Sequence, residues 1–256
     1  MPEDGLVFAT ARDVTEHKRL QELARRQAED LVRSNADLEQ FAAIASHDLQ
    51  APLRGVHTLA DWIEQDLPQD APATVHEHLR TLRRRVDLMA RLVADLLAYA
   101  RAGREEEAVQ VTDTGALVAD IVEMIAPPAG LKIVVNDDLP ELETASSALE
   151  QVLRNLIVNA IEHHDRDAGT VRIAARRRGE QWELSVADDG PGIPREARDK
   201  VFEMLWSSSS GERRGTGMGL ALVRRLVERV GGRVWIDPHE GRGTTIRFTW
   251  PNKLMG

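Results

Sequence analysis

Apolar residues in the N-terminal part of the chain recur at alternating spacings of four and three, and no other feature restricts the fold as strongly. Between Leu20 and Ala45 the repeated positions are Leu20, Ala24, Gln27, Leu31, Ser34, Leu38, Phe41 and Ala45. This heptad spacing predicts a coiled-coil helix. Gln27 and Ser34 are polar positions in the seam, and such positions weaken a coiled coil and can set its register.

Two further heptad stretches predict a helical hairpin. They comprise Leu53, Val56, Ala60, Ile63 and Leu67, and then Val75, Leu79, Leu82, Val86, Met89, Val93, Leu96 and Ala100. Pro68 and Pro72 mark the turn between them, and we expect the second helix to end near Ala102. One partner helix cannot bury the apolar stripe of such a hairpin, so we expect a homodimer that forms a four-helix bundle. We interpret the arginine-rich run 80–85 as a solvated face.

The C-terminal part has the pattern of mixed helices and strands, and it follows a charged linker at Gly103–Glu107. We expect helices at 112–125, 146–164 and 219–230, with Ser146 or Ser147 capping the second. Strands are expected at 131–135, 171–176, 182–187, 233–237 and 244–250. The predicted fold class is therefore α+β: an antiparallel helical hairpin followed by an α/β sandwich with its helices on one mixed sheet.

Composition excludes several classes of protein. The 256 residues contain no cysteine, which excludes disulfides and thiolate metal sites. The net charge of -9 argues against nonspecific binding to nucleic acid. No apolar run is long enough to span a bilayer, and no signal peptide is found at the start, so we expect a cytoplasmic protein.

The first candidate site is the pair His47 and Asp48, on the polar side of the helix that contains the hairpin's first stretch. Pro52 follows closely, and a proline inside a helix removes a backbone hydrogen bond and bends the chain. A neutral imidazole is nucleophilic near neutral pH, because its unperturbed pKa is about 6.5. A single exposed histidine is usually only solvated, so this pair needs a second signal to indicate function.

Asn155 and Asn159 provide a second candidate site on the helix expected at 146–164. They lie four residues apart and therefore share one helix face. Amide oxygens can bind Mg²⁺ without adding negative charge beside a nucleotide, and Mg²⁺ prefers oxygen ligands. An asparagine pair alone is weak evidence, since such amides commonly make ordinary hydrogen bonds.

Two glycine-containing segments are further candidate sites, one after an expected strand and one before the last expected helix. Asp188 ends a strand and is followed by Gly190 and Gly192, where a carboxylate can accept from an adenine amino group and the glycines let the backbone approach the base. Residues 201–203 and the serine-rich stretch 206–211 are together expected to form a mobile lid. The second segment precedes the last helix, and its backbone N–H groups would make an anion site; it comprises Arg214, Gly215, Thr216, Gly217 and Gly219.

The order and spacing of these motifs behind a histidine-bearing hairpin resemble the sensor histidine kinases of two-component signalling. The resemblance covers roughly residues 20–250. It implies domains at 16–40 (signalling coiled coil), 41–103 (dimerisation and phosphoacceptor) and 104–256 (ATP-binding). Residues 1–15 are either the end of a PAS-like sensor domain or a simple N-terminal arm, because the D-V-T-E-x-K junction at 13–18 resembles the end of a PAS domain.

The same resemblance implies the roles of individual residues. His47 would be the phosphoacceptor, Asp48 its general base, Asn159 the Mg²⁺ ligand and Asn155 its support. Asp188 would bind adenine, while Gly190, Gly192, Gly215, Gly217 and Gly219 would form the two glycine boxes. The cofactors would be ATP and Mg²⁺. The phosphoryl group would pass to an aspartate of a response regulator receiver domain.

Two positions depart from the family pattern. Glu162 stands where the family usually has Lys or Arg, and a carboxylate near phosphates weakens ATP binding unless it points away. Ala51 replaces a common Thr or Asn, so we expect weak phosphatase activity toward the regulator. Glu162 keeps open a second interpretation, a non-catalytic dimeric adaptor that binds nucleotide or regulator. A histidine phosphotransfer protein needs no ATP site, and a gyrase-type or chaperone-type ATPase needs no exposed histidine on a dimeric hairpin.

Overall fold

The computed structural model describes residues 19, 22–23, 25–27, 48–68, 71–102, 108–136, 138–206, 215–238 and 241–253. Residues 19, 22–23 and 25–27 are helical. The N-terminal arm at 1–15, most of the predicted coiled coil and His47 lie outside the described residues.

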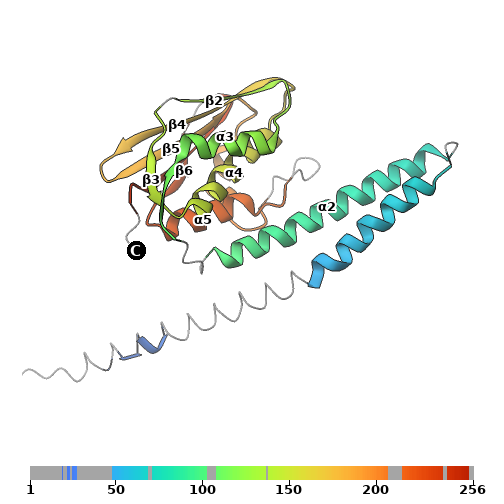
Figure 1. Cartoon of the computed structure of the whole chain (residues 1–256), viewed down its shortest axis with the longest axis horizontal. Coiled ribbons are helices and arrows are strands. Elements are labelled where there is room, and N and C mark those ends of the chain that lie inside the picture. Colours follow the sequence, from blue (N-terminus) through green and yellow to red (C-terminus); the bar gives the residue numbers. More distant parts are fainter. Residues whose placement is uncertain are drawn as a thin grey trace, which may run out of the picture.

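A helix over residues 48–66 and helix α2 (Ala73–Arg101) form the predicted hairpin (Figure 1). The first helix continues through Pro52 without a break. Between the helices, Arg83 Nη2 donates to Asp61 Oδ1 at 2.5 Å, and Arg83 also pairs with Glu64. The interpretation of 80–85 as a solvated face is therefore wrong for Arg83, whose guanidinium forms ion pairs between the two helices.

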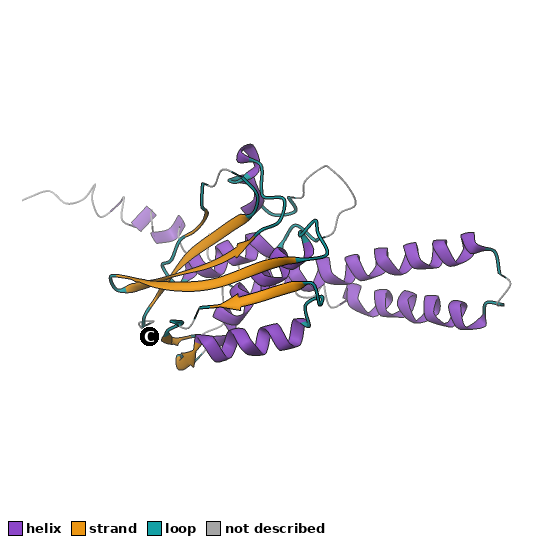
Figure 2. Ribbon diagram, turned by 90° about the horizontal axis from the view of Figure 1, so that it is seen from above, coloured by secondary structure: helices purple, strands orange, loops and turns teal. Residues whose placement is uncertain are grey.

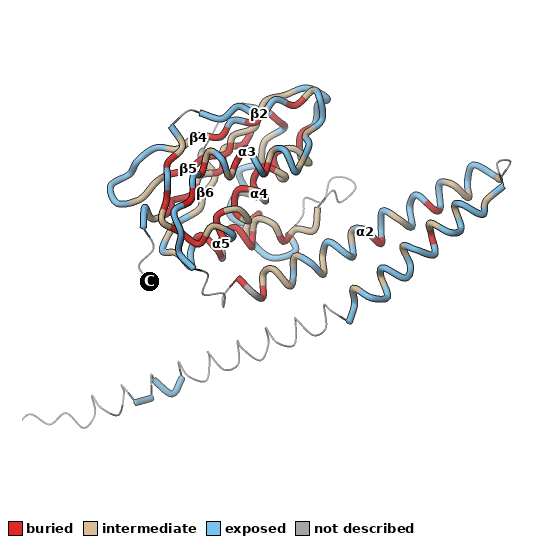
Figure 3. Tube along the Cα trace, viewed as in Figure 1, coloured by how far each residue is buried: buried red, intermediate tan, exposed pale blue. Residues whose placement is uncertain are grey.

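Most described residues of the hairpin are exposed or half-buried, and only a few are buried (Figure 3). Ala60, Leu79 and Val86 are buried between the helices. Exposed apolar side chains form rows that step by seven residues and comprise Leu49, Val56 and Ile63 on one helix and Leu82, Met89 and Leu96 on the other. A single chain thus leaves both of these rows uncovered.

The C-terminal part is built on a five-stranded sheet in the order β2-β4-β5-β7-β6. Its strands are β2 (Leu131–Val135), β4 (Gly169–Arg178), β5 (Gln181–Asp188), β6 (Val234–Ile236) and β7 (Thr244–Pro251). β2 and β4 are parallel, and the other pairs are antiparallel. A small second sheet pairs β1 (Gln110–Asp113) with β3 (Glu141–Thr144).

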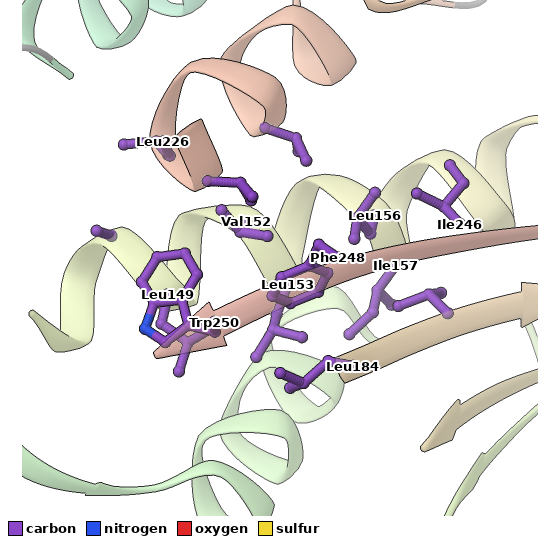
Figure 4. Packing of buried hydrophobic residues seen from close by; sticks show 14 of the residues in the cluster. Leu149, Val152, Leu153, Leu156, Ile157, Leu184, Leu226, Ile246, Phe248 and Trp250 are labelled. Atoms are coloured by element: carbon purple, nitrogen blue, oxygen red, sulfur yellow. The ribbon is translucent and has the colours of Figure 1, made fainter. Parts of the chain in front are cut away.

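Three helices lie on one face of the large sheet, as predicted (Figure 2): α3 (Thr114–Ile125), α4 (Ser146–Glu162) and α5 (Gly219–Arg229). Two short 3-10 helices lie between β5 and α5 in the chain: η1 (Arg195–Ala197) and η2 (Lys200–Phe202). The core lies between α4 and the sheet (Figure 4), where Leu153, Phe248 and Trp250 are fully buried. Burial of these large side chains stabilises the layer by about 1.5–3 kcal/mol each.

Several predicted boundaries need correction. The helix expected at 112–125 begins at Thr114, because Asp113 caps it by accepting from the N–H groups of Gly115 and Ala116 at 2.8 and 3.0 Å. Residue Thr112 belongs instead to β1. Neither Ser146 nor Ser147 caps α4: its N-cap is Ala145, which makes no side-chain capping bond. The strands expected at 171–176 and 182–187 are longer, and α4 ends at Glu162.

The end of α2 packs against α5. The guanidinium of Arg225 lies 4.5 Å from the centre of the Tyr99 ring, and Arg229 Nη1 donates to the Ala102 carbonyl oxygen at 2.8 Å. Ala102 also belongs to the core of the α/β part.

Within the described ranges, no helix has the length and apolar character that crossing a membrane requires.

Candidate functional site

The two asparagines of α4 lie on the helix face that meets the start of α5. Asn155 Nδ2 donates to the Gln151 carbonyl oxygen at 2.7 Å, which fixes the amide. Its Oδ1 would lie 3.1 Å from a Cβ placed on Gly219. Any side chain at position 219 would therefore crowd Asn155, and glycine allows the N-terminus of α5 to approach α4.

Asn159 lies one turn further along α4 and is half-buried. Among the residues that the structure describes, its side chain makes no hydrogen bond, so its amide oxygen is available to a ligand. An uncharged oxygen of this kind matches the ligand preference of Mg²⁺.

Asp188 ends β5 and is held by backbone N–H groups. Its Oδ1 accepts from Gly190 N at 2.9 Å and from Thr244 N at 3.3 Å. Burial raises the pKa of this carboxyl, and the two N–H donors partly offset that effect. In the described part of the chain, Oδ2 has no hydrogen bond, which leaves one acceptor with a fixed direction.

Two glycines at turns have positive φ angles and lie very close to the backbone of another segment. Gly192 has φ +84°, and a Cβ there would lie 3.0 Å from the Gly243 carbonyl oxygen. Gly217 has φ +70°, and a Cβ there would lie 2.5 Å from the carbonyl oxygen of Trp206. Only glycine fits both the conformation and the space at position 217.

A buried histidine joins the end of α4 to the Asp188 loop. His164 Nε2 lies 2.8 Å from Asp189 Oδ1, and Thr170 N donates to the same oxygen at 2.9 Å. The hydrogen bond to Asp189 raises the pKa of His164, and Thr170 N–H and His164 lower the pKa of Asp189. The neighbouring Asp165 pairs instead with Arg242, whose Nη2 lies 2.6 Å from Asp165 Oδ1. The sequence pattern did not predict this role for His164.

Helix α2 contributes two further side chains that sequence reasoning missed. Thr216 Oγ1 donates to Asp95 Oδ2 at 2.5 Å, and Arg91 Nη1 lies 3.3 Å from Glu162 Oε1. Burial raises the pKa of Asp95, while the hydrogen bond from Thr216 acts in the opposite direction. Glu162, which departs from the family pattern, is thus directed to an arginine of the hairpin.

The hairpin register places this contact near the start of its first helix. His57 Nε2 lies 3.4 Å from Asp87 Oδ1, and Arg83 reaches Asp61, so in this antiparallel register Asp95 lies level with Leu49. Asp48 precedes Leu49 and is exposed. The glycine loop therefore touches α2 at the height of the predicted catalytic pair.

Apart from Asp48, the predicted site residues that the structure describes come from α4, from β5 and the loop after it, and from α5 and the turn before it, and close approaches link these elements. Gly219 lies beside Asn155, Gly190 N donates to Asp188, and Gly190 and Gly215 lie near His164 and His163 at the end of α4. Asp48 lies on a different element, the first hairpin helix. His47, Arg214 and the part of the expected lid at 207–211 lie outside the described residues.

Comparisons with known protein families match two parts of the chain. Residues 37–105 match the His Kinase A (phospho-acceptor) domain, and residues 144–254 match the histidine kinase-, DNA gyrase B-, and HSP90-like ATPase family. Nostoc sp. cyanobacterial phytochrome A is 34% identical over 229 residues, which is 88% of this chain and 30% of that protein. The Escherichia coli sensor histidine kinase ZraS is 29% identical over 84% of this chain and 45% of its own length.

Solved structures agree with this assignment. Full-length ShkA, solved in complex with AMPPNP, superposes with a TM-score of 0.66 and is 30% identical, over 85% of this chain and 46% of that one. A phosphoacceptor helical hairpin joined to an ATPase fold of this type defines the histidine kinase class of signalling proteins. The chain belongs to the sensor histidine kinase family, and it spans less than half the length of these relatives.

Proposed function

We propose that the chain is an ATP-dependent protein histidine kinase that phosphorylates His47 and passes the phosphoryl group to an aspartate of a response regulator. One observation carries the proposal: Asn155 on α4 and Gly219 at the start of α5 lie in contact, so both nucleotide motifs face one space. The match of residues 37–105 to the phosphoacceptor family supplies the acceptor helix.

The residues of the α/β part have separate roles in binding ATP. Asp188, fixed by Gly190 N–H and Thr244 N–H, presents its remaining oxygen to the adenine amino group. Asn159 would hold Mg²⁺, and the ion would supply positive charge against the negative charge that spreads over the transferred phosphoryl group. The free N–H groups at the start of α5 bind the phosphates, because a helix N-terminus carries partial positive charge.

The transfer itself requires one bond to form and one to break. A ring nitrogen of His47 attacks the γ-phosphorus, the bond from that phosphorus to the β–γ bridging oxygen breaks, and ADP leaves. Asp48 accepts the other ring proton and so stabilises the imidazole as positive charge develops. The contact between Thr216 and Asp95, level with Leu49, supports an approach of the ATP site to this part of the hairpin.

The test is incubation of the purified chain with γ-labelled ATP and Mg²⁺, beside His47→Gln, Asn159→Ala and the matched control His78→Gln. His78 is an exposed histidine of α2. We expect acid-labile, alkali-stable label on the wild type and on His78→Gln. His47→Gln should bind ATP yet remain unlabelled, and Asn159→Ala should lose label together with its Mg²⁺ dependence.

Two results would contradict the proposal. Nucleotide binding without label on the wild type favours the alternative, a non-catalytic dimeric adaptor. Label that persists in His47→Gln would assign the acceptor to another residue. The contact between Glu162 and Arg91 weighs against the adaptor, because it accounts for the unusual carboxylate without placing it on the phosphates.

A further inference from the structure

The sheet face opposite the helices carries a concentration of arginines that the kinase reaction does not use. In the strand register, Arg176 of β4 pairs with Glu183 of β5, and Arg247 of β7 pairs with Ser185 and Trp235. Neighbours in register share a face. This face, here called the basic face, therefore presents five arginines against the two carboxylates of Glu183 and Asp237: Arg172, Arg176, Arg178, Arg233 and Arg247.

One buried carboxylate arranges three of these arginines. The Glu183 side chain has no exposed surface, and it receives Arg176 Nη2 at 2.6 Å, Arg178 Nη1 at 2.9 Å and Arg247 Nη1 at 3.1 Å. Arg247 also pairs with Asp237. A guanidinium has five N–H donors, so these ion pairs leave donors on each arginine and hold them in fixed positions. Within the described residues, Arg233 has no ion-pair partner.

The basic face is hollowed rather than flat. An open groove of about 980 Å³ lies over β4, β5, β6 and β7, and its lining includes Arg176, Arg178, Arg233 and Arg247 together with Gln181, Trp235 and Asp237. The volume is at the upper end of small-molecule pockets, and its openness suits an extended segment. Trp235 adds a half-buried aromatic surface beside the charges.

We propose that this groove is a docking surface for an acidic, extended polypeptide segment of a partner protein. Charge complementarity argues for this occupant: the whole chain has a net charge of -9, yet the basic face has a clear excess of positive charge. A nucleic acid fits less well, because a long polyanion would also meet the acidic remainder of the chain. The proposal is independent of the kinase reaction, since the groove lies across the sheet from α4 and α5.

The experiment measures fluorescence anisotropy of labelled hexaglutamate with the full chain in saturating Mg·ATP, which excludes binding at the nucleotide site. We expect binding that weakens between about 0.05 M and about 0.3 M salt, because screening shortens the reach of exposed charges. Arg233→Glu should weaken the affinity for hexaglutamate at least about fivefold, because an exposed attraction between opposite charges becomes a repulsion. Arg224→Glu is the matched control, because Arg224 is an exposed arginine of α5 on the opposite layer.

Each other outcome counts against the proposal. No binding, or equal loss in Arg233→Glu and Arg224→Glu, would mean that the groove has no special affinity for acidic segments. Tighter binding of a DNA duplex that Arg233→Glu abolishes would assign the groove to nucleic acid. A gain of peptide affinity in the triple variant Glu105→Gln, Glu106→Gln and Glu107→Gln would identify the chain's own linker as the occupant.

Arg178→Gln provides a second, milder variant should Arg233→Glu fail to fold. It leaves Glu183 paired with Arg176 and Arg247, so the buried carboxylate keeps two partners. We expect about a twofold to fivefold loss of hexaglutamate affinity. Unchanged affinity in a folded Arg178→Gln, as judged by ATP binding, would overturn the proposal.

Discussion

At the scale of single residues, the pair His164 and Asp189 predicts a dependence of stability on pH. The pKa of His164 is raised in the folded chain, so its contribution is fully present below the unfolded value of about 6.5 and is lost as pH rises through the folded value. The pKa of Asp189 is lowered, so its contribution is lost only in acid. Asp189→Asn should therefore destabilise the chain more at about pH 5.5 than at about pH 8.5, by about 2 kcal/mol at the lower pH.

Urea unfolding followed by tryptophan fluorescence measures this difference, since Trp250 is buried in the same core. Asp165→Asn is the comparison: its charge raises the pKa of His164 less than the hydrogen bond to Asp189 does, so its effect should change less between these two pH values. A loss in Asp189→Asn that is the same at both pH values would mean that His164 does not carry the proton.

Gly217 allows a second residue-scale prediction, because its φ is positive and its surroundings are closed. Gly217→Ala should reduce ATP affinity at least about tenfold, since the new Cβ must displace the backbone at Leu205 and Trp206. Gly179→Ala is matched to it, with φ +64° and no atom within 4 Å of the new Cβ. Titration calorimetry with Mg·ATP should show unchanged affinity for Gly179→Ala; equal losses in both variants would contradict the explanation.

Motif spacing predicts candidate site residues more readily than the residues that support them. It indicates Asn155, Asn159, Asp188 and the glycines, because each residue type suits a particular contact with the nucleotide or with Mg²⁺. His164 was not found, since a histidine doublet in sequence gives no indication of which ring is buried. Its partner Asp189 lies beyond two strands, and only the folded chain brings the two together.

At the scale of elements, the contact between α2 and the α/β part should influence phosphoryl transfer. Arg91 reaches Glu162 on α4, and Asp95 accepts from Thr216 in the glycine loop. These bonds hold the ATP site level with Leu49 and Asp48. Arg91→Glu should therefore lower the rate of autophosphorylation about threefold to tenfold, because two carboxylates would then repel, while ATP affinity stays the same.

The charge swap Arg91→Glu with Glu162→Arg is the informative control. It restores an ion pair of opposite direction, so most of the rate should return if docking is the cause. Phosphorylation time courses at saturating ATP, with nucleotide affinity measured separately, distinguish docking from binding. A swap variant as slow as Arg91→Glu would refute a docking role for the pair.

The elements themselves were predicted to different degrees, for physical reasons. Long helices such as α2 and α4 were found because many apolar residues recur at helical spacing and so indicate the same buried face. Strands β1 and β3 were missed: each has four residues, and they pair with each other across α3 and β2. The partner of Glu162 could not be predicted, because Arg91 is distant in sequence and approaches it only through the packing of α2 on α5.

At the scale of the whole molecule, the exposed rows of the hairpin argue for a second copy of the chain. Leu49, Val56 and Ile63 continue one face of the first helix, and Leu82, Met89 and Leu96 continue one face of α2. Their exposed fractions range from 36% at Leu96 to 52% at Met89. Packing two hairpins face to face would bury both rows, as in a four-helix bundle.

This arrangement predicts that the dimer depends on the rows and not on the rest of the helix surface. The double variant Val56→Glu and Met89→Glu should be monomeric at micromolar concentration, because each dimer would bury four carboxylates without partners. Thr81→Glu adds a charge at an exposed position of α2 beside the row and should leave the dimer intact. Sedimentation equilibrium measures both. A dimeric Val56→Glu/Met89→Glu variant would place the interface elsewhere, whereas a monomer that still binds ATP would show that the α/β part keeps its fold without the bundle.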